Sequence, residues 1–378
     1  LYTVQKEIEG LYVGNTYHVL VIANAGDLTN EITNIEGLKN KTFNEVIVTH
    51  DTEQWFLMAS EKDSGEIEIR ANNSEYNPTW VSVDVERMTA RVDCAWKDEY
   101  EITGENMPSE GESPYQNKKD RVEILGAALV NRYVGGTFAF KRVTEDITDL
   151  NVDYLGDETT NENNIATNYV LDPKTSSGKN SSDYTYYYTE YANWKDKDFN
   201  LDKTISSEVG ETSYYRLSYT CENINRSGNL STINDEIEWK EKYVTGIMYK
   251  ALYIPTGFTK GDTFYKYNNQ LYKFKDITGP NGPFPDLTES ELELSQGVET
   301  FKNGICYYTY WIRHAADNID EINPMEYAIV RNNIYQLNVI SVSGLGNSQP
   351  ENVEEQEIIV HFKVKRWNDV SVTVPSFD

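Results

Sequence analysis

Cysteine, histidine and long hydrophobic runs are scarce in this sequence. The 378 residues include three cysteines and four histidines, and none of them forms a CxxC pair or a paired-histidine zinc motif. Three widely spaced cysteines (Cys94, Cys221 and Cys306) do not make a disulfide framework, so we expect small buried apolar side chains. No apolar stretch approaches the roughly 18 residues that a membrane-spanning helix needs.

Positive charge is scarce as well. Lysine and arginine total 34 against 61 acidic residues, which gives a formal net charge of −27. Nucleic-acid binding needs a positive surface, so this balance argues against it. The chain nevertheless holds 28 tyrosines, 12 phenylalanines and 7 tryptophans, enough large apolar surface to fill a core and to exclude wholesale disorder.

No motif of a common enzyme class is present. The sequence has no GxSxG element, no glycine-rich phosphate loop and no zinc-deaminase signature. With 61 acids, carboxylate pairs arise by chance, and an unrecognised acidic dyad is the one remaining enzymatic alternative. We therefore expect no enzymatic activity and no cofactor.

The dominant hydrophobic period is two, which predicts a mainly β fold with the texture of β-sandwiches. Val81, Val83 and Val85 alternate with polar residues, and the apolar phase resumes after Arg87, as at a bulge. Strands are predicted at 17–23, 121–130, 138–143, 214–221, 243–254, 306–314, 334–343 and 357–367, with a hairpin at 264–274 turning at Asn268-Asn269. Helical patterns are weak and confined to 27–47 and 286–296.

Polar segments in the middle of the chain predict two domains. Residues 161–164 and 174–182 are rich in Asn, Ser and Thr, as in loops. We place the boundary between 143 and 150, which divides the chain into residues 1–147 and 148–378. No fixed-period repeat is visible, so propellers and solenoids are excluded.

Two local clusters could carry binding. Asp196, Asp198, Asn200 and Asp202 resemble the start of a calcium loop, but Leu201 and Ser207 stand where that loop has Gly and Glu, which favours a solvated loop. The run from Tyr184 to Tyr191 is either a strand packed on both faces or a platform for sugars or a partner. A secreted or surface carbohydrate-binding protein that uses this platform is the alternative function.

The C-terminus carries two apolar-alternating segments. Ile358, Val360, Phe362 and Val364 share one face of a strand, and Val370, Val372 and Val374 resume the alternation after Trp367-Asn368-Asp369. Such a last strand either completes its own sandwich or is offered to a neighbouring chain. The pattern alone favours the first reading. The basic run from Lys363 to Arg366 is interpreted as an exposed strand face.

Several segments, in order, resemble Bacteroidales type V fimbrilins, the subunits of major and minor fimbriae. An aromatic strand is followed by a ΦxRNxxY motif, where Φ is apolar, and by a GxG pair. The resembling segments are Tyr17–Gly26, Val85–Val92, Gly126–Asn131, Tyr307–His314, Met325–Tyr335, Ser343–Gly346 and Trp367.

The resemblance implies two transthyretin-like β-sandwich domains in a structural pilin subunit that supports adhesion. Family members are exported as lipoproteins and trimmed by a surface protease, and trimming leaves a groove that the last strand of the next subunit fills. By this resemblance Val370, Val372 and Val374 are donor side chains and Trp367 anchors the strand's entry, while Val19, Val21 and Ile22 line the groove. The expected location is the cell surface, attached to the outer membrane through the lipidated precursor.

The expected partners are other copies, related anchor or tip subunits, and a host or bacterial surface receptor. The sequence starts at Leu1 without an initiator methionine, and we expect it to be a trimmed form.

Overall fold

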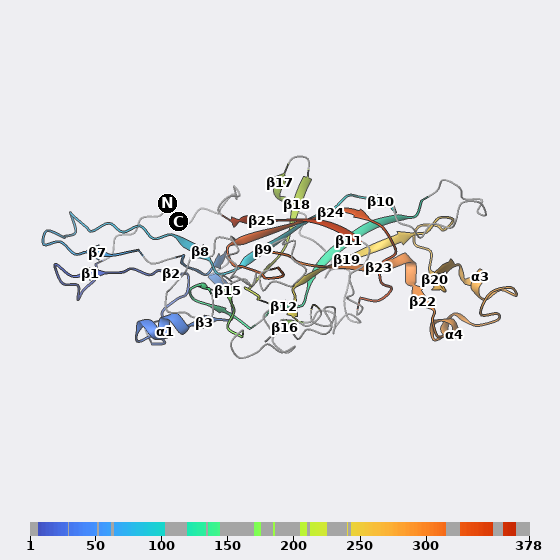
Figure 1. Cartoon of the computed structure of the whole chain (residues 1–378), viewed down its shortest axis with the longest axis horizontal. Coiled ribbons are helices and arrows are strands. Elements are labelled where there is room, and N and C mark those ends of the chain that lie inside the picture. Colours follow the sequence, from blue (N-terminus) through green and yellow to red (C-terminus); the bar gives the residue numbers. More distant parts are fainter. Residues whose placement is uncertain are drawn as a thin grey trace, which may run out of the picture.

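The protein is elongated in the computed structural model, with β1 and β7 at one end and α3, α4 and β20 to β22 at the other (Figure 1). The structure describes residues 7–28, 30–50, 53–61, 64–102, 119–133, 135–143, 170–174, 184–185, 205–209, 212–224, 240, 243–314, 326–350 and 358–367. The acidic segment Asp196–Asp202 and the valines Val370, Val372 and Val374 lie outside these ranges.

Two sheets dominate the fold. The larger has the order β17 (Ile205–Val209), β18 (Thr212–Thr220), β9 (Ala90–Ala95), β24 (Asn333–Val342) and β25 (Ile358–Arg366). The other has the order β10 (Tyr100–Glu101), β11 (Arg121–Val130), β19 (Gly246–Ile254) and β23 (Ile305–Trp311). Neighbours are antiparallel except β9 and β24, which run parallel.

The apolar alternation predicted from the sequence forms the main core between these sheets. Val92 and Leu337 on the five-stranded sheet share one buried cluster with Leu129, Tyr249 and Tyr308 on the four-stranded sheet. Alternate residues of a strand point to opposite faces, so each strand places every second side chain in this layer. The mainly β prediction is confirmed in this architecture.

The predicted boundary at residue 147 does not separate these strands. β11 pairs with β19 along its whole length, and β9 pairs with both β18 and β24. Both sheets therefore join strands from the two sides of the boundary, and cutting there would break their hydrogen bonds. The division into residues 1–147 and 148–378 stays a prediction, and the strand pairing shows only that hydrogen bonds cross residue 147. That the chain contains two transthyretin-like units stays a prediction.

A second, smaller core lies under short strands near the N-terminus. It buries Leu57, Ala59, Met88, Tyr133 and Phe140. The sheet around it has the order β2 (Ile22–Ala23), β6 (Met58–Ser60) and β8 (Val85–Arg87). The described residues also form five two-stranded pairs: β1 (Thr16–Tyr17) with β7 (Ile67–Glu68), β3 (Thr42–Phe43) with β13 (Thr137–Phe138), β4 (Ile47–His50) with β5 (Glu53–Phe56), β12 (Arg132–Tyr133) with β16 (Tyr184–Thr185), and β14 (Arg142–Val143) with β15 (Val170–Leu171). Helix α1 (Ile35–Asn40) is capped by the Asn34 side chain.

A compact module connects β19 to β23. It contains β20 (Phe264–Tyr267), β21 (Gln270–Tyr272), α3 (Phe274–Ile277), α4 (Glu289–Glu293), β22 (Glu299–Phe301) and the 3₁₀ turn η5 (Lys302–Gly304). Asn268 and Asn269 have φ of 48° and 61°, so the predicted hairpin turn is confirmed. A capping box between Thr288 and Glu291 begins α4.

Replacing Leu337 with alanine tests the main core. Leu337 is fully buried in β24, and removing a buried leucine side chain costs about 2–5 kcal/mol of unfolding free energy. Ile359→Ala on the neighbouring strand β25 is the matched control, because Ile359 is 56% exposed. Urea unfolding measures both variants. Equal losses in the two would contradict a core between the sheets.

His314 predicts a pH dependence of stability. Burial lowers its pKa to about 4, and its Nδ1 lies 2.8 Å from the Tyr335 hydroxyl. The unfolded chain binds the proton near pH 6.5. Its contribution to stability is therefore complete above about pH 6.5 and is lost as the pH falls towards about 4.

His314→Gln should flatten the dependence of unfolding free energy on pH in this window by up to about one proton. His361→Gln, at an exposed site on β25, is the matched control. Denaturant unfolding at a series of pH values measures the slopes. Identical slopes for wild type and His314→Gln would refute the assignment.

Candidate functional site

Trp367 is fixed in a box of aromatic and cationic side chains. The residue is 3% exposed, and its ring stacks on Tyr219 at a centroid distance of 5.7 Å and an angle of 3°. Phe56 packs edge-on at 5.3 Å. The guanidinium groups of Arg87 and Arg91 lie 4.7 and 5.3 Å from the ring centroid, as in cation–π pairs.

The backbone holds Trp367 at the same point. Its N–H donates to the carbonyl of Asn332 over 2.9 Å, and the N–H of Asn332 donates to the carbonyl of Thr89 over 2.9 Å. Asn332 has φ of 57°, a left-handed conformation that asparagine tolerates better than most residues. The end of β25 is therefore tied to β24 and to the start of β9. That Trp367 anchors the entry of a donor strand stays a prediction.

Val19, Val21 and Ile22, the predicted groove residues, lie along one half-buried segment. The N–H groups of Val19 and Val21 donate to the hydroxyls of Ser64 and Ser60, at 2.8 and 2.7 Å. The strand predicted over 17–23 is consequently interrupted, and only Tyr17 in β1 and the two residues of β2 have regular pairing. Ile22 packs against the second core.

The structure thus brings Ile22 to an apolar core at the edge of a sheet. Among the described strands, β2 pairs with β6 alone, at Ile22–Ala59 and Ala23–Met58. Leu20, two positions before Ile22, packs on the same core and was not predicted. The two-residue spacing of Leu20 and Ile22, which places both on one face of an extended chain, was the sequence feature that could have indicated it.

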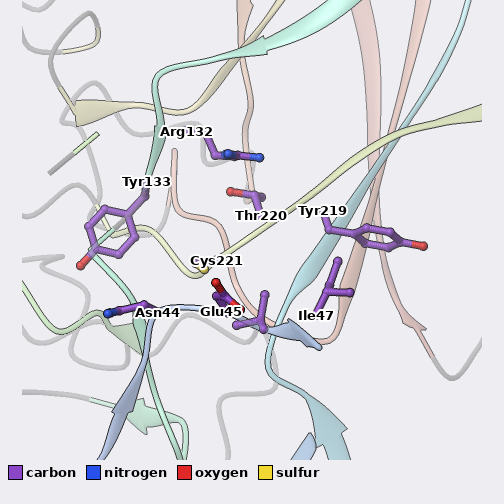
Figure 2. Close-up of a pocket in the computed structure, with 9 residues that line it drawn as sticks. Asn44, Glu45, Ile47, Arg132, Tyr133, Tyr219, Thr220 and Cys221 are labelled. Carbon is purple, nitrogen blue, oxygen red and sulfur yellow. The ribbon is translucent and has the colours of Figure 1, made fainter. Parts of the chain in front are cut away.

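A pocket of about 240 Å³ opens beside this core (Figure 2). Its lining comes from β3 to β4, from β12 and from the end of β18: Asn44, Glu45, Val46, Ile47, Arg132, Tyr133, Tyr219, Thr220 and Cys221. Tyr219, which stacks on Trp367, forms part of its wall. Burial raises the pKa of Cys221 to about 11, so its thiol stays protonated and unreactive.

All three cysteines are free and buried, as predicted. Of the tyrosine run, the structure describes only the backbone of β16, which pairs Tyr184 with Tyr133 and Thr185 with Arg132. The sugar-binding alternative therefore remains a prediction.

Within the described ranges there is no group of three or more His, Cys, Asp or Glu side chains that could hold a metal. No helix there is long and apolar enough to cross a membrane.

A buried charge cluster, which the sequence reasoning missed, lies next to the Trp367 box. The fully buried Arg331 guanidinium donates to Glu222 through Nε at 2.8 Å and Nη2 at 2.5 Å. It also donates to the Thr137 hydroxyl and to the carbonyls of Phe138 and Ala139, at 2.8, 2.7 and 3.2 Å. The arginine in the ΦxRNxxY motif was the only feature of the sequence that pointed to it.

A second ion pair completes this cluster. Lys141 donates to Glu86 at 3.2 Å, and the other oxygen of Glu86 lies 4.0 Å from Arg331. Burial raises the pKa of Glu86, while Lys141 and Arg331 oppose the shift. For Arg331, burial acts to lower the pKa, but Glu222 and Glu86 outweigh it and the pKa is raised. Two cations thus face two carboxylates away from water.

Arg331→Met should destabilise the protein strongly. The substitution leaves Glu222 and Glu86 buried with too little compensating charge, and breaking a buried pair in this way costs about 3–5 kcal/mol. Arg121→Met is the control, because the Arg121–Glu99 pair is half-exposed and such pairs contribute at most about 1 kcal/mol. Urea denaturation reports both. A loss in Arg331→Met no larger than in the control would mean that the cluster does not stabilise the fold.

Comparison with known proteins links the C-terminal part of the chain to a family. Residues 299–376 match the model "Major fimbrial subunit protein type IV, Fimbrillin, C-terminal". This range holds β23 to β25, Trp367 and the three valines that follow it. The resembling segments before residue 299 lie outside the match. No curated protein sequence matches the chain.

Solved structures give weaker likenesses. A candidate cell adhesion protein from Parabacteroides distasonis ATCC 8503 is 14% identical with a TM-score of 0.45, and the match covers 95% of this chain and 85% of that one. The fimbrilin (fimA) of Porphyromonas gingivalis W83 is 14% identical with a TM-score of 0.40, covering 94% and 81%. These values are too low to transfer a function.

Proposed function

We propose that the chain is a structural subunit of a bacterial surface fimbria that supports adhesion, because residues 299–376 match the fimbrillin C-terminal family model. Its role is non-enzymatic and needs no cofactor. The subunit polymerises by donor-strand exchange, in which the segment after Trp367 enters the groove of the next copy. Lipidation of a precursor, trimming by a protease and attachment to the outer membrane belong to the same proposal.

The observation that supports the donor role most directly is the fixed position of Trp367. Its ring and its N–H are both engaged, so the last described residue before the valines has a fixed position. Val370, Val372 and Val374 follow with period two. An extended strand places such residues on one face, where they can fill successive pockets of an acceptor while the backbone pairs with its edge.

The acceptor in this proposal is the edge of β2. Ile22 and Leu20 already contact the second core and are only half-buried, so an added strand would remove further apolar surface from water. Val19 and Val21 belong to the same segment and complete the proposed groove. A donor strand that pairs with this edge would extend the sheet formed by β2, β6 and β8.

A contact of this kind is heterologous and open. The donor surface and the acceptor surface differ, so each added copy leaves one of each free, and the product is a filament. The partners are therefore further copies of the chain, related anchor or tip subunits at the filament ends, and a surface receptor.

Deleting residues 368–378 should abolish filaments while leaving a folded monomer, since a donor strand in this proposal completes the next copy and not its own sandwich. Val372→Asp should lower polymer yield by at least about tenfold, because a carboxylate would have to enter an apolar pocket. Thr373→Asp is the matched control: it adds the same charge one residue away, on the opposite face of the strand. Negative-stain electron microscopy and sedimentation measure polymer.

Two results would refute the donor role. One is undiminished polymerisation of the chain that lacks residues 368–378. The other is an equal effect of Val372→Asp and Thr373→Asp, because a strand seated in pockets distinguishes its two faces.

A further inference from the structure

One end of the molecule is an acidic arm with unusual apolar exposure. The arm consists of residues 7–17 and 66–81 around the β1–β7 pair (Figure 1), and the N–H of Gly14 donates to the carbonyl of Ile69 over 2.9 Å. Its exposed large apolar side chains include Ile8, Tyr12, Val13, Tyr76 and Trp80. Single exposed apolar residues are ordinary, but several gathered on one projection mark an interaction surface.

The arm is also negatively charged. It contains five glutamates and one arginine, Arg70. Glu66 and Glu68 are exposed and stand two residues apart at β7. Residues at this spacing on a strand lie on the same face, about 7 Å apart. The arm therefore offers two carboxylates at a fixed distance beside apolar surface.

The outward face of β25 carries the opposite charge at the same spacing. His361, Lys363 and Lys365 alternate with Val360, Phe362 and Val364, which pack towards the main core. Lys363 and Lys365 are thus also about 7 Å apart on one face. Burial and the charge of Lys363 lower the pKa of Lys365 while Asp93 opposes the shift, so the repulsion between the two lysines is only partly offset and a further carboxylate would reduce it. The exposed Ile359 adds apolar surface to this face.

Chain continuity would bring these two surfaces together in a filament. β25 ends at Arg366, directly before Trp367 and the donor segment. The arm strand β1 ends at Tyr17, five residues before Ile22 in the acceptor strand β2. When the donor of one copy pairs in parallel with β2 of the next, only a few residues of extended chain separate the end of β25 in the first copy from the arm of the second.

We propose that the acidic arm of the accepting copy docks on the basic outward face of β25 of the donating copy, with Glu66 and Glu68 opposite Lys363 and Lys365. This inference rests on the proposed function, because it adds a second contact to the donor-strand junction. The arm's apolar side chains are covered in the same step. The contact also supplies local attraction between copies that each carry a formal charge of −27.

A charge exchange tests the contact. At about 50 mM salt, where screening is weak, Lys363→Glu/Lys365→Glu and Glu66→Lys/Glu68→Lys should each slow filament elongation by about tenfold or more. Combining all four substitutions should restore elongation to within about threefold of wild type. Light scattering follows elongation, and circular dichroism verifies folding.

Lys260→Glu/Lys302→Glu is the control for net charge. Both lysines are more than half exposed and belong to or flank the module at the other end of the molecule. This variant changes the net charge as much as Lys363→Glu/Lys365→Glu and should elongate within about twofold of wild type. Equal slowing by the control and by the β25 variant would overturn the proposal. Failure of the fourfold variant to recover would overturn it as well.

A peptide of residues 368–378 separates this inference from the proposed function. Its binding to the chain that lacks these residues is measured by fluorescence anisotropy. The peptide contains neither arm nor β25, so neither charge reversal should alter its affinity. If the peptide binds and the reversals leave elongation unchanged, the arm contact alone is refuted. If the peptide does not bind, the donor-strand function fails and this inference fails with it.

Discussion

The buried pairing of Arg331 with Glu222 is the interaction on which the rest of the structure depends. Removing a guanidinium and a carboxylate from water is costly, and the cost is offset only where geometry and further hydrogen bonds are good. Arg331 meets that condition by donating to Glu222, to Thr137 and to two backbone carbonyls. The pairing ties the end of β18, the strand segment around β13 and the start of β24 to one point, so the second core and the main core cannot shift independently.

The same pairing orients the exit of the C-terminal segment. Asn332 follows Arg331 directly, and its left-handed backbone presents an N–H to Thr89 and a carbonyl to Trp367. The position of Trp367 is therefore set by the neighbour of the buried arginine as well as by stacking on Tyr219. A structural ion pair in this way determines where a strand that is proposed to assemble filaments begins.

Local structure was largely predictable from the sequence, whereas the pairing of distant strands and the contacts between distant side chains were not. The strand at 121–130 and the hairpin at Asn268-Asn269 follow from alternation and turn chemistry, which are local properties. The parallel pairing of β9 with β24 joins residues more than two hundred positions apart, and alternation carries no information about such a partner. Trp367 was predicted to anchor the strand, but its four partners come from β5, β8, β9 and β18 and could not be read from its neighbours.

The distribution of charge differs on the two sides of Trp367. The charged strand β25, before it, opposes pairing with a further strand, whereas residues 370–374, after it, are suited to such pairing. Among the described strands β25 lies at the edge of its sheet, and its outward lysines oppose addition of an arbitrary strand, as charges on sheet edges commonly do. After Trp367 and the pair Asn368-Asp369, residues 370–374 contain no charge and alternate valine with small polar residues. In a chain of charge −27, repulsion beyond about 8 Å is screened at physiological salt. The choice of partner strand is therefore governed by the few side chains that meet at the junction. Before Trp367 these include the lysines of β25, and at residues 370–374 they are uncharged.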